Sequence, residues 1–87
     1  MKAQVTITRK DEGARSQIKT DSAEWNKDYA SWDDALIEAE QGGLMNATES
    51  GAAKLLPPVF PYHTTSEIEL AALGRLGFVE GKAGPPR

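Results

Sequence analysis

The chain of 87 residues carries a net charge of −3 and contains 39% hydrophobic residues and no cysteine. A chain of this length has room for one domain that buries about 60–65% of its unfolded surface, so a large enclosed substrate pocket is not expected. The lack of cysteine excludes disulfides, thiolate metal ligands and cysteine nucleophiles. No apolar run approaches the roughly 20 residues of a membrane span, and no signal-peptide core is visible, so we expect a cytoplasmic protein without membrane attachment.

The charges are distributed unevenly along the chain. Residues 1–20 carry five basic and two acidic side chains, whereas residues 21–50 carry one basic and eight acidic side chains. Two packed elements with solvated faces would produce this pattern, because charge runs usually face water. A polarity used to bind a partner is the alternative.

An alternating pattern opens the chain. Small or apolar side chains at Ala3, Val5 and Ile7 are separated by polar ones, which is typical of a strand with one buried face. A turn from Lys10 to Gly13 leads into a second, more polar strand. We therefore expect an antiparallel hairpin whose outer face is solvated and whose second strand lies at an edge of the sheet.

Residues 21–31 support two interpretations. Read as a helix, the segment starts with a capping-box pattern and joins the next segment in one helix of about twenty residues. Read as a strand, it places Trp25, Lys27 and Tyr29 on one face and lets Ser31 start a new helix. We favour the strand, because Ser31 suits a helix cap better than a helix interior and two strands alone are marginal.

The clearest helix signal of the chain covers residues 32–41. Ser31 can cap the first turn, and Gly42 or Gly43 can adopt the left-handed conformation that ends the helix. At 100° per residue, one face collects the side chains expected to be buried, which are Trp32, Ala35, Leu36 and Ala39. The acidic residues, Glu38 among them, lie elsewhere and should face water, and Ile37 also falls outside the buried stripe.

The segment from Leu44 to Thr65 contains mainly turn and loop signals. We expect one short helix over residues 48–56, which a pair of prolines must end. The following Pro-x-x-Pro spacing over residues 58–61 lacks a basic flank, so an extended connector is favoured over a ligand for SH3-type domains. Its apolar side chains should fill a core: Val59, Phe60 and Tyr62.

A capping box starting at Ser66 predicts the second main helix, over residues 66–76, with Gly77 at its end. Apolar side chains cover more than half of its circumference, so the helix is either central or half-exposed until a partner covers it. The candidate partner-binding residues are Leu70, Leu73 and Leu76. The residues from His63 to Ser66 precede this helix, where an anion could bind, although a plain cap needs only Ser66.

Patterns that carry chemistry are missing from the sequence. His63 is the only histidine, and no spacing typical of a metal site surrounds it. The acidic residues show none of the contrast in environment that acid–base catalysis requires, and the glycines form no phosphate-binding loop. We therefore expect no enzymatic activity, no cofactor, no metal and no small-molecule substrate.

Two functions remain. The favoured one is a small protein-binding or regulatory module that associates with a protein partner, or with itself, through the apolar C-terminal helix or a sheet edge. The alternative is a nucleic-acid-binding module, although the neighbouring acidic segment would repel phosphates and makes nucleic acid the less favoured partner. The candidate nucleic-acid-binding residues lie on the N-terminal hairpin: Arg9, Lys10, Arg15 and Lys19.

The elements combine into a predicted α+β domain over residues 1–80. Helices 32–41 and 66–76 should pack on one face of a small antiparallel sheet, which consists of the N-terminal hairpin and a third strand over residues 24–30. Residues 81–87 read as a flexible tail rich in glycine and proline.

The succession of hairpin, third strand and helix, with its junction from Tyr29 to Ala35, resembles the small β-β-β-α units of HicB-type antitoxins. The resemblance covers the first half of the chain. Residues 44–87 show none of the DNA-binding appendage of such antitoxins, and no functional residue is carried over.

Overall fold

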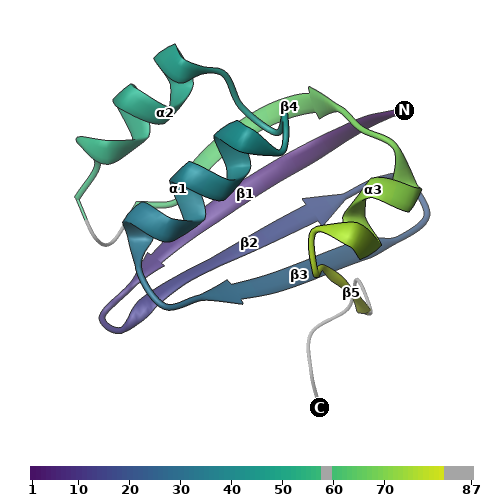
Figure 1. The fold of residues 1–87 in the computed structure, drawn as a ribbon, viewed down its shortest axis with the longest axis horizontal. Helices are drawn as coiled ribbons and strands as arrows, with labels where there is room; N and C mark the ends of the chain where they lie inside the picture. The colour runs from purple at the N-terminus through teal and green to yellow at the C-terminus, as the bar shows by residue number, and fades with distance from the viewer. Residues whose placement is uncertain (58–59, 82–87) are drawn as a thin grey trace.

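The computed structural model describes residues 1–57 and 60–81, which form a five-stranded antiparallel sheet with three helices (Figure 1). This is the predicted α+β class. The strands are β1 (Lys2–Lys10), β2 (Gly13–Lys19), β3 (Glu24–Tyr29), β4 (Tyr62–Glu67) and β5 (Val79–Gly81). The helices are α1 (Trp32–Gln41), α2 (Ala47–Lys54) and α3 (Leu70–Arg75).

The strand order is β4-β1-β2-β3-β5. β1 and β2 form the predicted hairpin, with Lys10 opposite Gly13 across a two-residue turn. Gly13 has φ +99°, and a Cβ at this position would approach the Tyr29 carbonyl oxygen to 2.2 Å, so the turn requires glycine. The expectation that the second strand lies at an edge is wrong, because β3 pairs with the other side of β2.

The strand interpretation of residues 24–30 is confirmed. β3 pairs with β2 from Glu24 to Tyr29, and α1 starts afresh after it. The Ser31 hydroxyl accepts a hydrogen bond from the Asp34 backbone N–H at 3.1 Å, as expected for a helix cap. The cap separates strand from helix and rules out one continuous helix.

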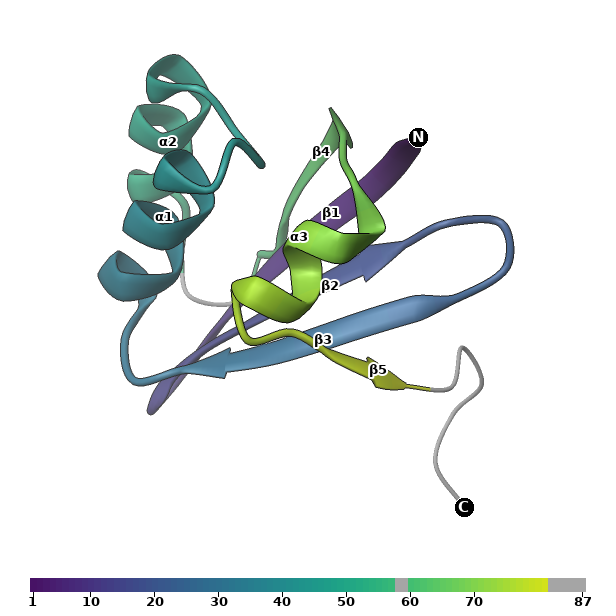
Figure 2. The same cartoon turned by 45° about the vertical axis from the view of Figure 1, so that its right-hand side comes forward.

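All three helices lie on one face of the sheet, here called the covered face (Figures 1 and 2). The predicted stripe of α1 is buried against β1 and β2, whose inward side chains Val5, Ile7 and Ile18 are fully buried. Ile37 falls outside the stripe and is 49% exposed, as predicted. The opposite face carries no helix among the described residues and is called the open face.

The short helix predicted for residues 48–56 is α2, which ends at Lys54, before the prolines. Its start is a capping box. The Asn46 side chain accepts a hydrogen bond from the Glu49 N–H at 2.8 Å, and the Glu49 carboxylate accepts one from the Asn46 N–H at 2.9 Å. The Thr64 hydroxyl also donates to Glu49, which ties α2 to β4.

The predicted helix 66–76 is only partly correct. Residues 62–67 form β4, and α3 begins at Leu70, with Glu69 at the N-cap and no side-chain cap. The Ser66 hydroxyl donates to the Gly43 carbonyl, and the Glu67 carboxylate pairs with the N-terminal ammonium, so neither acts in the expected capping box. The end of the helix is as predicted, with Gly77 at φ +89°.

The connector before β4 is described from Phe60 onward, and Pro58 and Val59 lie outside the described residues. Phe60 was expected to fill the core, but its side chain is 57% exposed. Tyr62 is partly buried and packs against the core, as expected. Gly81, predicted to start the tail, is the last residue of β5, and residues 82–87 lie outside the described part of the chain. None of the described helices has the length and apolar character to cross a membrane.

Candidate functional site

The three leucines predicted to bind a partner occupy different environments. Leu73 is 1% exposed and belongs to the core, and Leu76 packs partly buried against the core. Leu70, at 43% exposed, is the one member of the set with a largely accessible side chain. The C-terminal helix therefore presents no continuous leucine surface in this conformation.

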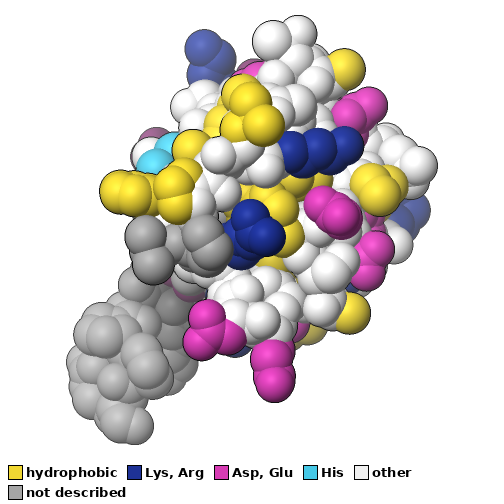
Figure 3. Space-filling view, turned by 90° about the vertical axis from the view of Figure 1, so that its left-hand side faces the viewer, with side chains coloured by type: hydrophobic (Ala, Val, Ile, Leu, Met, Phe, Trp, Pro, Cys, Tyr) yellow, Lys and Arg dark blue, Asp and Glu magenta, His cyan; other side chains and the backbone are white. Residues whose placement is uncertain are grey.

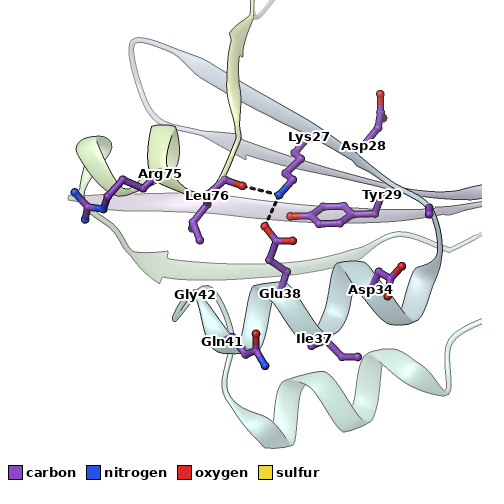
Figure 4. Close-up of a pocket in the computed structure, with 11 residues that line it drawn as sticks. Lys27, Asp28, Tyr29, Asp34, Ile37, Glu38, Gln41, Gly42, Arg75 and Leu76 are labelled. Atoms are coloured by element: carbon purple, nitrogen blue, oxygen red, sulfur yellow. Dashed lines mark hydrogen bonds and ion pairs between the residues drawn. The ribbon is translucent and has the colours of Figure 1, made fainter.

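A lysine of the sheet holds this helix in place. Lys27 lies on the covered face, and its ammonium group donates to the Glu38 carboxylate of α1 and to the Leu76 carbonyl at the end of α3 (Figure 4). Its aliphatic chain passes beside Gly77, where a Cβ would lie 3.4 Å from Cε. Glu38 is thus half-buried and paired, which corrects the expectation that it faces water.

This arrangement borders a cleft of about 700 Å³ between β3, α1 and the end of α3. The Lys27 ammonium also lies 4.9 Å from the centre of the Tyr29 ring. Burial, with the nearby Glu38 carboxylate, raises the pKa of the Tyr29 hydroxyl above its ordinary value. Lys27 therefore bridges β3, α1 and α3, and two of its three N–H donors have protein acceptors.

The basic residues of the hairpin do not form one patch. Arg9 points to the covered face, where its guanidinium lies 5.9 Å from the centre of the Trp32 ring. Lys10 and Arg15 lie on the open face, and both pair with Asp28 of β3. Arg15 donates two hydrogen bonds to this carboxylate, at 2.8 and 3.2 Å, and this bonding lowers the pKa of Asp28.

Lys19, the fourth basic candidate, lies 3.7 Å from the Glu24 carboxylate. Three of the four basic side chains therefore have an acidic partner on β3, and two of them share Asp28. A side view shows basic and acidic side chains interspersed over the surface (Figure 3). Pairing of β2 with β3 therefore places basic side chains of residues 1–20 beside acidic side chains of residues 21–50.

His63 and Ser66 do not lie at a helix N-terminus, so the considered anion site has no structural basis. Both belong to β4, and the Nδ1 atom of His63 lies 3.0 Å from the Thr6 hydroxyl on the open face. In Figure 3, hydrophobic side chains lie next to this histidine. Leu55 and Phe60 are exposed large apolar residues in the segment between α2 and β4.

The hydrogen-bond pattern shows that β4 has an unused edge. Met1 and Ile68 exchange two backbone hydrogen bonds, of 2.8 and 3.2 Å, so they form a hydrogen-bonded pair. Such pairs alternate along antiparallel strands, so Tyr62, Thr64 and Ser66 bond to β1. The backbone N–H and C=O groups of the residues between them point away from the sheet, and these residues are His63, Thr65 and Glu67.

The two edges of the sheet differ in the way they are protected. β5 has three residues and ends in glycine, which makes it a poor template for another strand. β4 has six residues, pairs with β1 without a bulge, and contains no proline, lysine or arginine. The side chains of His63, Thr65 and Glu67 are exposed, and no described residue donates to or accepts from their backbone groups.

Comparisons of the chain with protein-family models, with curated proteins and with solved structures give no match. The candidate site is therefore defined by the geometry of the molecule, and its strongest feature is the edge of β4. A sheet edge is among the binding elements predicted from the sequence, whereas β4 itself is not predicted as a strand. The signal that could have found it is the run from Tyr62 to Thr65, because aromatic and β-branched residues favour strands.

Proposed function

We propose that this protein is a small protein-binding module and that its binding element is the edge of β4, which accepts an extended segment of a partner as an additional strand. The observation that carries the proposal is the set of outward-pointing backbone groups at His63, Thr65 and Glu67. Addition of a strand satisfies these groups through main-chain hydrogen bonds, which supply affinity without a deep pocket.

The environments of the other candidate residues support the edge over the alternatives. Binding through α3 would require Leu73, whose burial removes it from contact with a partner. Binding of nucleic acid would require unpaired positive charge, and three of the four basic candidates already face carboxylates. Leu70 remains available beside the end of β4 and fits a role at the margin of the same site.

A library of random peptides displayed on phage tests the proposal, with the full chain immobilised at low density. We expect enrichment of peptides that bind the native chain and at least tenfold weaker binding to Thr65→Pro, which removes one outward N–H. The Thr65 N–H makes no bond to β1, so this variant keeps the β1 ladder, and its fold is checked by circular dichroism. Failure to enrich peptides, or equal binding to Thr65→Pro, would contradict the proposal.

A further inference from the structure

We propose that the strand accepted by β4 is β4 of a second copy of this chain, related by a twofold axis that is perpendicular to the sheet and passes midway between the two Thr65 residues. This inference rests on the proposed function, because it names the partner of the same edge. The resulting assembly has one continuous sheet of twice five strands, with both helix layers on the same side. The register, the side-chain pairing and the apolar flanks of β4 all favour this twofold arrangement.

The register follows from the direction of the backbone groups. Hydrogen-bonded pairs across the new seam must involve outward-pointing residues on both strands. An axis through Thr65 pairs Thr65 with itself and His63 with Glu67 of the second copy, so all outward groups of the strand are used. With the axis at Thr64, Glu67 would lie opposite Pro61, which has no N–H to donate. With the axis at His63, Thr65 would lie opposite that proline.

The side chains brought together by this register are compatible. His63 and Glu67 both lie on the open face, and the axis sets each imidazole opposite a carboxylate. The two threonines at the axis form a pair of β-branched residues, which is favourable across strands. No like charges face one another between positions 63 and 67.

The flanks of β4 carry apolar side chains that the same axis brings together. Phe60 and Leu70 are each five residues from Thr65, and they are 57% and 43% exposed. Twofold symmetry places the Phe60 end of each strand beside the Leu70 end of the other. Association therefore removes exposed apolar surface at both ends of the seam, in addition to the backbone hydrogen bonds in its middle.

Sedimentation equilibrium combined with single-cysteine variants tests the inference, since the chain has no native cysteine. We expect the mass to rise with concentration from 9.4 kDa towards twice that value. Thr65→Cys should oxidise to a covalent dimer, because Cα atoms of a hydrogen-bonded pair lie about 5.5 Å apart, within the range of a disulfide. The matched control Gln17→Cys lies on the same face of β2, about 24 Å from its counterpart, and should form no disulfide-linked dimer.

Two further variants are designed to prevent pairing of the two β4 strands. Thr65→Pro removes the N–H at the axis, and Thr65→Glu places two carboxylates opposite each other, so both should remain at 9.4 kDa. A dimer that persists in both variants, without cross-linking of Thr65→Cys, would overturn the inference. A native chain that stays monomeric to about 1 mM overturns it too. In that case, peptide binding that is lost in Thr65→Pro would leave the proposed function standing, and absence of peptide binding would remove both.

Discussion

The covered and open faces of the sheet differ in what stabilises them. On the covered face, Val5, Ile7 and Ile18 are fully buried beneath α1, and their contribution comes from apolar burial. On the open face, Arg15 and Asp28 pair in water, where such pairs contribute little. Most of the stability is therefore expected to come from the covered face, and substitutions on the open face should cost less.

Leu36→Ala gives the largest expected effect, because Leu36 is fully buried at the centre of the α1 stripe. Lost burial and the remaining cavity should lower the free energy of unfolding by about 2–5 kcal/mol, measured by urea unfolding. Ile37→Ala, on the exposed side of the same helix, is the control and should cost less than about 0.5 kcal/mol. Equal changes in the two variants would mean that α1 buries a different face.

Lys27→Ala tests whether the polar bridge on the covered face holds α3. It removes the hydrogen bonds to Glu38 and to the Leu76 carbonyl, and the free energy of unfolding should fall by about 1–3 kcal/mol. Amide exchange should accelerate most at Phe78, whose N–H bonds to the Leu73 carbonyl behind α3.

The control for this bridge is Lys10→Ala, which breaks a 3.8 Å contact with Asp28 between two exposed side chains. We expect little change in its urea midpoint. If the urea midpoint of Lys27→Ala changed as little as that of Lys10→Ala, the polar bridge would not hold α3, and burial of Leu73 would be the main contribution.

Arg15→Ala gives the smallest effect, on the open face. Removal of the Arg15 side chain should lower the free energy of unfolding by about 0.2–1 kcal/mol, and added salt should reduce this difference between the variant and the native chain. The pKa of Asp28 is lowered in the folded protein, chiefly by its hydrogen bonds to Arg15, so the pair stabilises the fold above the unfolded pKa of about 4. This stabilisation is lost as the pH falls through the pKa of Asp28 in the folded protein. The free energies of unfolding of the native chain and of Arg15→Ala should therefore converge as the pH falls below that pKa.

The part of the fold that could be predicted is the part with local signals. Ser31, the buried stripe of α1 and the left-handed Gly43 each act within one or two turns of helix, and the structure has all three. The choice between helix and strand for residues 24–30 also depended on a local feature, the cap at Ser31. Asn46 and Glu49 form a capping box whose spacing was equally visible in the sequence but was not used.

The part that could not be predicted depends on contacts between distant residues. Ser66 has the local pattern of a helix start, yet β1 needs a second neighbour, and pairing of residues 62–67 with it overrides the capping pattern. The candidate edge was missed for the same reason. An alternating pattern shows which side chains are buried, whereas the order of strands decides which backbone groups stay unpaired.

The pairing of β1 with β4 also has a kinetic consequence. Thr6 and His63, which face each other across this pair, are 57 residues apart in the chain, whereas β1, β2, β3 and α1 follow one another directly. Closing so large a loop is slow in comparison with forming local contacts, so the N-terminal half is expected to assemble first. Until β4 pairs with it, β1 is itself an open edge that carries Val5 and Ile7, so we expect this stage of folding to favour strand pairing between chains.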